Sequence, residues 1–144
     1  MPLDPPQRDS SGKTIPHNNE RIGDRDGIIR RVSPHHLVDD QKTGGKRLSS
    51  MAFRPSSGHD GGMSVDLQCL IEEAGLDPRV YVSTPRWIGA VRFAAGDLRA
   101  EALAVGWDPL PELPYHGQVW GEFSRQLLLR LRDLAEEFVP FLKA

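Results

Sequence analysis

Glycine and proline recur along this chain at short intervals, and this limits how long its strands and helices can be. The sequence holds 14 glycines and 12 prolines among 144 residues. Glycine loses much conformational entropy when it is ordered, and proline has no amide hydrogen to donate, so both tend to end regular structure. With 38% hydrophobic residues, the chain can still fill one core. We therefore expect a single small domain that is rich in loops.

Short apolar runs between turn residues predict the strands of this domain. Asp66 is well placed to cap a helix over 67–74, which Gly75 would end. The segment 97–105 fits either a strand or a helix. Strands and helices mixed in this way predict an α+β fold with a short mixed or antiparallel sheet. The predicted strands are 27–32, 48–53, 63–66, 80–82 and 87–93.

The last predicted element is a helix over 123–142. Its apolar residues recur at helical spacing, with charged residues on the other side, which predicts a long C-terminal amphipathic helix packed against the sheet. The alternative is that the helix offers this stripe to a partner, for example to a second copy of the chain in a homodimer. The stripe consists of Leu127, Leu131, Leu134, Phe138 and Leu142.

The first 26 residues differ in composition from the rest of the chain. Their only large apolar side chains after Met1 are Leu3, Ile15 and Ile22. So few apolar residues bury too little surface to offset the entropy lost on ordering. We expect residues 1–26 to form a disordered, flexible N-terminal arm and residues 27–144 to form the single α+β domain.

Several classes of protein are excluded by composition and motifs. No run of about 18 apolar residues is present to span a membrane, and the N-terminus lacks the charged-then-apolar order of a secretory signal, so we expect a soluble, cytoplasmic protein. The single Cys69 excludes an internal disulfide. We expect no metal, because the adjacent His35 and His36 point to different sides of an extended chain. The glycine-rich nucleotide-binding motifs are missing, and we expect no cofactor.

Charge is distributed unevenly along the chain. The net charge is −2, yet residues 28–62 hold six Arg/Lys against three Asp. Arginine forms planar, charge-assisted hydrogen bonds with oxyanions, so this locally basic segment suits a small anionic ligand such as a phosphate. Nucleic-acid binding would require a larger positive excess with exposed aromatic residues. We therefore expect a protein partner or a small anionic ligand, and no nucleic acid.

The polar residues that could form a site fall into two groups. Arg30 and Arg31 on the first strand and Ser49 and Ser50 on the next are candidates for ligand binding. The candidates for catalysis are Ser50, Asp66 and His116. Plain structural roles compete with these assignments, since Asp66 can cap a helix and the arginines can form ion pairs.

A serine nucleophile would need a base and an orienting group beside it. Ser49, Ser50 or Ser64 could combine with His116 and Asp66 in this way. None of these serines lies in a Gly-x-Ser-x-Gly elbow, and the sequence offers no local support for that chemistry.

Two resemblances rest on these segments. Arginine on one strand followed by serine on the next is similar to ADP-ribosyltransferase-like folds, which would imply a dinucleotide ligand and a later glutamate. The chain departs from that pattern, because Glu122 precedes a helix. The segments Arg30-Arg31-Val32-Ser33-Pro34, Ser49-Ser50-Met51-Ala52-Phe53 and Met63-Ser64-Val65-Asp66 resemble a family of small uncharacterised bacterial proteins, which implies bacterial origin and no particular activity.

Two hypotheses about function follow. The first is a binding or protein-interaction module that uses the polar face between residues 30 and 66. The second is an enzyme acting on a nucleotide-like or phosphorylated substrate, in which arginines bind the oxyanion, Ser49 or Ser50 positions the substrate, and His116 or Asp66 exchanges protons. An enzyme should bring Arg31, Ser50, Asp66 and His116 into one pocket.

Overall fold

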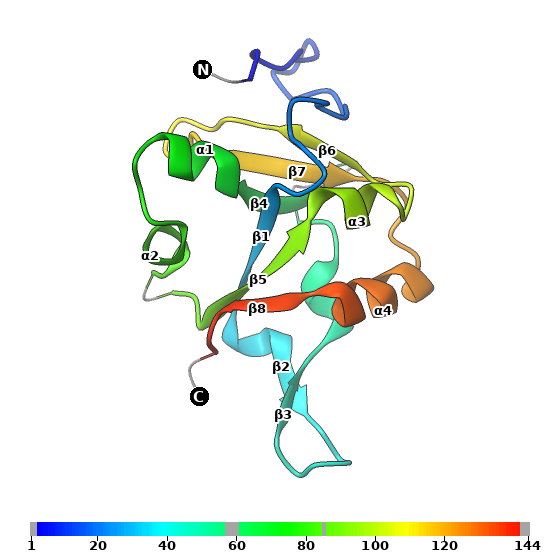
Figure 1. Ribbon diagram of the computed structural model, residues 1–144. Helices are drawn as coiled ribbons and strands as arrows, with labels where there is room; N and C mark the ends of the chain where they lie inside the picture. Colours follow the sequence, from blue (N-terminus) through cyan, green and yellow to red (C-terminus); the bar gives the residue numbers. More distant parts are fainter. Residues whose placement is uncertain (1–2, 57–60, 85, 142–144) are drawn as a thin grey trace.

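The computed structural model describes residues 3–56, 61–84 and 86–141. At its centre is a six-stranded antiparallel sheet with the strand order β6-β7-β4-β1-β5-β8 (Figure 1). The chain is one small α+β domain, as the alternation of strand and helix patterns predicted. The strands of this sheet are β1 Gly27–Val32, β4 Met63–Leu67, β5 Gly89–Ala94, β6 Ala104–Trp107, β7 His116–Trp120 and β8 Glu136–Val139.

The first predicted strand is confirmed and lies in the middle of the sheet. Strand β1 pairs with β5 along all six of its residues and with β4 at Ile28 and Ile29. Side chains alternate between the two faces of a strand. Ile28 and Val32 belong to the larger hydrophobic core, whereas Ile29 belongs to a smaller one. Residues of β1 therefore contribute to two separate cores.

The helices are short. Leu127, Leu128 and Leu131 of α4 pack into the larger core together with Phe53. Ile71 and Val82, from α1 and α2, belong to the smaller core. Of the described helices, α4 is the longest, with ten residues. The α-helices are α1 Gln68–Glu73, α2 Pro78–Val82, α3 Ala95–Arg99 and α4 Arg125–Leu134, and the 3-10 helices are η1 Pro34–His36 and η2 Ser50–Phe53.

The prediction of one long C-terminal helix is wrong in its extent. Helix α4 ends at Leu134, and the chain continues as β8, which pairs antiparallel with β5. The free edge of β5 offers backbone hydrogen bonds, and as a strand the chain also buries Phe138 in the smaller core. The apolar residues of α4 are used in the core of the same molecule, and a homodimer through this helix stays a prediction. Leu142 lies outside the described residues.

The prediction of a strand over 48–53 is also wrong. Strands β2 Leu37–Asp39 and β3 Lys46–Leu48 form a separate hairpin, and the chain then turns into η2. Ser49 caps the start of this 3-10 helix, because its side chain accepts a hydrogen bond from the backbone amide of Met51. The short hydroxyl side chain thus competes with strand pairing for the local backbone.

Other predicted elements also differ from those in the structure. Segment 80–82, predicted as a strand, belongs to α2, which Asp77 caps through the amide of Arg79. The ambiguous segment 97–105 contains both the end of α3 and the start of β6. Strand β7 was not predicted at all. No helix among the described residues is long and apolar enough to cross a membrane.

The expectation of a disordered, flexible N-terminal arm is supported only in part, because some residues of segment 3–26 pack against the domain. Leu3 and Ile22 are buried in the larger core, and the backbone amide of Asn19 donates to Val105 on β6. The His17 ring occupies the space that a Cβ at position 106 would need, so Gly106 allows this close approach. A few well-placed apolar residues are enough to anchor a polar segment. The domain boundary predicted at residue 27 stays a prediction.

Candidate functional site

An open cleft of about 1260 Å³ borders strands β1 and β4 of the sheet. It is formed by β1, η1, β4, the segment before β5 and the segment between β6 and β7. Its lining is rich in arginine, histidine and serine. The chemically active side chains that line it are Arg30, Arg31, Ser33, His35, His36, Ser56, Ser64, Asp66, Thr84, Arg86, Glu112 and His116.

Arg31 and Asp66 form a two-bond ion pair in this cleft. Arg31 Nε donates to Asp66 Oδ2 at 2.8 Å, and its Nη2 donates to Oδ1 at 3.1 Å. The two side chains are only 15% and 8% exposed. The prediction that Asp66 caps α1 is therefore wrong. Its carboxylate instead accepts its hydrogen bonds from the paired guanidinium on the sheet face. The pair holds Arg31 in one orientation, with the Tyr81 ring beside its guanidinium.

His116 lies next to Asp66 on the neighbouring strand, since Asp66 and His116 are directly paired between β4 and β7. Paired residues project from the same face of a sheet. His116 Nδ1 lies 2.8 Å from the backbone oxygen of Asp108 and 3.3 Å from its carboxylate Oδ2. His116 Nε2 lies 3.1 Å from the hydroxyl of Ser64. The imidazole is therefore held between the oxygen atoms of Asp108 and the hydroxyl of Ser64.

These contacts decide how a neutral His116 carries its proton. A carbonyl oxygen only accepts hydrogen bonds, so the contact with the Asp108 carbonyl requires a hydrogen on Nδ1. Nε2 is then the basic nitrogen and faces Ser64. A base held in one tautomer beside a hydroxyl is the arrangement used to activate nucleophiles.

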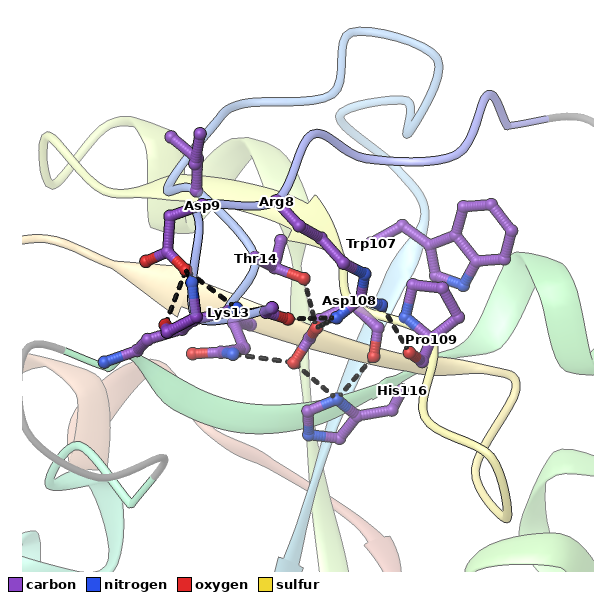
Figure 2. Close-up of polar contacts among 12 residues, drawn as sticks. Arg8, Asp9, Lys13, Thr14, Trp107, Asp108, Pro109 and His116 are labelled. Carbon is purple, nitrogen blue, oxygen red and sulfur yellow. Dashed lines mark hydrogen bonds and ion pairs between the residues drawn. The ribbon is translucent and has the colours of Figure 1, made fainter.

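Asp108 is the centre of a buried hydrogen-bond cluster behind His116 (Figure 2). Thr14 Oγ1 donates to Asp108 Oδ1 at 2.6 Å, and Gln118 Nε2 donates to Oδ2 at 2.7 Å. Burial by itself would raise the pKa of Asp108, but hydrogen bonds from His116, Thr14 and Gln118 outweigh it and hold the pKa well below its usual range. Asp108 is thus an ionised carboxylate that can stabilise a charged His116.

Arg30 lines the same cleft but has a structural role. Its Nε donates to the backbone oxygen of Ala52, and its Nη1 donates to the backbone oxygen of Ser64 and to the hydroxyl of Ser56. Burial lowers its pKa to about 10, and the charge of Asp66 acts in the opposite direction. Arg30 therefore ties η2 to β4 and stays protonated at neutral pH.

A second serine–histidine cluster occupies the other side of the cleft. The Ser33 hydroxyl lies 3.0 Å from His35 Nε2 and 3.3 Å from His36 Nδ1. Burial, together with the charges of Arg30 and His35, lowers the pKa of His36 to about 4. His36 is therefore a neutral, weak base at physiological pH.

The sequence-predicted residues are brought together only in part. Arg30, Arg31, Asp66 and His116 line the cleft, whereas Ser49 and Ser50 are not in its lining. Ser49 instead caps η2 and Ser50 is its first residue, so the second strand on which the ADP-ribosyltransferase resemblance depends ends before them.

The sequence analysis did not select Asp108 as a site residue, and it named Ser64 only as one of several possible serines. Ser64 alternates with Asp66 along a strand that pairs with β7, and this spacing was visible. Asp108 follows β6 and meets His116 only because β6 and β7 pair. No local motif in the sequence marks that contact.

The described residues give no support to a metal centre. The described part of the chain contains no group of three or more His, Cys, Asp or Glu side chains arranged to hold an ion. Burial, aided by the nearby carboxylate of Asp26, raises the pKa of Cys69 to about 11, so its thiol is protonated and unreactive at neutral pH.

A smaller cavity of about 310 Å³ adjoins the Asp108 cluster. It lies between the N-terminal segment and the sheet, and Ser64 and His116 line both this cavity and the main cleft. Arg8 closes one side, donating from Nη2 to the backbone oxygen of Pro109 at 2.9 Å (Figure 2). The N-terminal segment is therefore part of the wall of the site.

Thr14→Val is expected to lower the free energy of unfolding by about 1–3 kcal/mol, because a buried, charge-assisted hydrogen bond to Asp108 is lost without a change of shape. Chemical denaturation measured by circular dichroism gives this value. Ser11→Ala is the matched control, since its hydrogen bond to Asp9 is on the surface, and we expect a change of at most about 0.5 kcal/mol. Equal losses in both variants would show that the N-terminal segment is not anchored through Asp108.

Comparison with protein-family models, with curated proteins and with solved structures finds no match for this chain. The chemistry of the cleft is therefore inferred from its own geometry.

Proposed function

We propose that this chain is an enzyme that binds a phosphorylated or nucleotide-like ligand in the main cleft and uses His116 to exchange protons with it. The observation that carries the proposal is the convergence of Arg31, Asp66 and His116 on one cleft, with a basic imidazole nitrogen facing a hydroxyl. Such a reaction needs two components, which are cations that bind the anion and a base held in position next to it.

Binding is supported by two arginines with different surroundings. Arg31 donates to Asp66 from Nε and Nη2, and its Nη1 carries two further hydrogens that a ligand oxygen could accept. Arg86 is exposed at the cleft and lies over the Trp87 ring at 5.2 Å. A guanidinium stacked on an indole places a positive charge that can bind a phosphate next to an aromatic side chain that can contact a base.

Proton exchange is assigned to His116 rather than to Asp66. Asp66 is committed to Arg31, because both of its carboxylate oxygens accept hydrogen bonds from that guanidinium. His116 has the ionised Asp108 beside Nδ1, lines the cleft, and has Nε2 beside the hydroxyl of Ser64. Asp66 therefore acts as the residue that positions Arg31.

The interaction-module hypothesis stays a prediction and gains less support. The large apolar side chains that are exposed come from separate segments rather than from one surface element. Among the described residues they are Ile15, Met51, Leu76, Val80 and Leu110. A bacterial origin and a cytoplasmic location are likewise predictions from the sequence.

Arg86→Gln tests the binding step directly. We expect AMP, ADP or NAD to raise the melting temperature of the wild-type protein, because a ligand that binds only the folded state stabilises it. The shift should fall by at least half in Arg86→Gln, since an exposed cation contributes to binding without holding the fold. Differential scanning fluorimetry at several ligand concentrations measures both shifts.

Arg125→Gln serves as the control, because Arg125 is exposed at the start of α4 and does not line the cleft. Its ligand-induced shift should equal that of the wild type. No shift with any of these nucleotides, or equal losses in the two variants, would contradict the proposed ligand class.

A further inference from the structure

We infer that Ser64 is a nucleophile that takes a phosphoryl group from a phosphate ester and forms a covalent phosphoryl-serine intermediate. The inference rests on the proposed function and goes further, because it names the attacking atom and the reaction type. It is carried by the row of contacts from Ser64 through His116 to Asp108, across strands β4 and β7 and the end of β6.

The geometry of this row matches the requirements of a serine nucleophile. Ser64 Oγ and His116 Nε2 are 3.1 Å apart, which is within hydrogen-bond reach. On its other side, the same ring contacts the backbone oxygen of Asp108 at 2.8 Å and the carboxylate at 3.3 Å. The ring is thus oriented by a third group, as a nucleophile–base pair requires.

The rest of the fold keeps this row in place. His116 is 7% exposed and Asp108 is 5% exposed, so neither side chain can turn freely into solvent. Thr14 and Gln118 fix the two carboxylate oxygens of Asp108. The backbone oxygen of Ser64 accepts from Arg30, which holds the main chain of β4 at that residue. The nucleophile and its base are therefore positioned by rigid strands.

Ser33 is the rival nucleophile in the same cleft, because it also contacts histidine. Its partner His36 is a poor base, since burial and the nearby Arg30 lower the pKa of His36 to about 4. His35, its other partner, is an exposed residue within η1. No carboxylate contact with His35 or His36 is recorded among the described residues, whereas Asp108 supports His116. The chemistry therefore favours Ser64.

The reaction is balanced in two steps. Ser64 Oγ attacks phosphorus, its proton passes to His116 Nε2, the bond from phosphorus to the leaving oxygen breaks, and His116 gives the proton to that oxygen. Water then attacks the phosphoryl-serine, giving its proton to His116. The bond between Ser64 Oγ and phosphorus breaks, and the proton returns to Oγ. The products are phosphate, or a phosphate monoester from a diester, and the leaving alcohol.

The two cavities suit the two parts of such a substrate. Both are lined by Ser64 and His116, so the reacting phosphorus would sit where they meet. The main cleft, with Arg31 and Arg86, has the room and the charge for the larger anionic part. The smaller cavity beside Arg8 can take the other substituent.

Diisopropyl fluorophosphate is the probe that tests this inference without knowledge of the natural substrate. Its reaction with a serine forms the same oxygen–phosphorus bond and releases fluoride. We expect the full-length protein to gain one diisopropylphosphoryl group, located by mass spectrometry in the peptide containing residues 63–67. Ser64→Ala should abolish the adduct, and His116→Gln should slow labelling at least 100-fold.

Ser33→Ala is the matched control, since it removes a serine that also touches histidine in the same cleft, and it should be labelled at the wild-type rate. Near-UV circular dichroism shows whether each variant keeps the fold. Peptide mapping of the wild type decides the assignment even if His116→Gln fails to fold.

An absence of adduct, an adduct at Ser33, or unchanged labelling in folded His116→Gln would overturn the inference. Nucleotide binding that depends on Arg86 could persist in each of these cases. The failure of the Ser64 assignment is thus distinguishable from the failure of the proposed function.

Discussion

Replacing Arg31 with methionine is expected to lower the free energy of unfolding by about 3–5 kcal/mol, because the change leaves the carboxylate of Asp66 buried without its partner. Asp66 is 6% exposed, so water cannot replace the two hydrogen bonds from the guanidinium. Methionine keeps most of the side-chain volume, and the loss therefore measures the uncompensated charge rather than a cavity. Equilibrium denaturation in urea, followed by tryptophan fluorescence, gives the value.

The double variant Arg31→Met with Asp66→Leu should recover at least half of this loss, since removing both charges of a buried pair costs far less than removing one. Lys46→Met is the matched control. Its contact with Asp39 is short, at 2.6 Å, but the two side chains are 60% and 84% exposed. Exposed pairs contribute about 0–1 kcal/mol. If Arg31→Met cost no more than Lys46→Met, the pair could not be what holds Arg31 in the cleft.

Asp108→Asn is expected to lower the free energy of unfolding by about 2–4 kcal/mol at neutral pH. The side-chain amide has one acceptor oxygen where the carboxylate has two, so one donor among Thr14, Gln118 and His116 loses its partner and meets an N–H group. All charge assistance is lost as well. Urea denaturation of the wild type and the variant at a series of pH values measures the difference.

The pH dependence follows from the sign of the pKa shift. The pKa of Asp108 is depressed in the folded state, so the unfolded state takes up the proton first as pH falls. The stabilisation by Asp108 is fully present above the unfolded value of about 3.9. It decreases as pH falls toward the folded pKa. The difference between wild type and Asp108→Asn should therefore be present at pH 5 and should shrink below about pH 4. A difference that grew below about pH 4 would contradict the ionised state of Asp108.

Asp66 and His116 show how far sequence reasoning reached toward the site. Both were chosen because acid and imidazole groups perform proton chemistry, and both line the cleft. Their separation of 50 positions gave no reason to pair them, and only the register between β4 and β7 places them side by side. Asp108 was not chosen as a site residue, because its role depends on contacts with Thr14 and Gln118 that no local sequence pattern indicates.

The C-terminal segment shows where periodicity misled. Residues 127, 131, 134 and 138 fit one helical stripe, and the first two do pack from α4 into the larger core. Phe138 is buried as well, but from strand β8 in the smaller core. A spacing of seven from Leu131 is compatible with a helix, yet the free edge of β5 could be completed only by a strand.

The sequence by itself determined the elements that local chemistry controls. The run of β-branched and arginine residues ended by Ser33-Pro34 defines β1, and the many glycines and prolines keep most other elements short. The tertiary structure decided the sheet order, the strand β8, the docking of residues 3–26 and the row from Ser64 to Asp108. These depend on pairings between distant segments, whose hydrogen bonds and burial outweigh local preference only once the chain is compact.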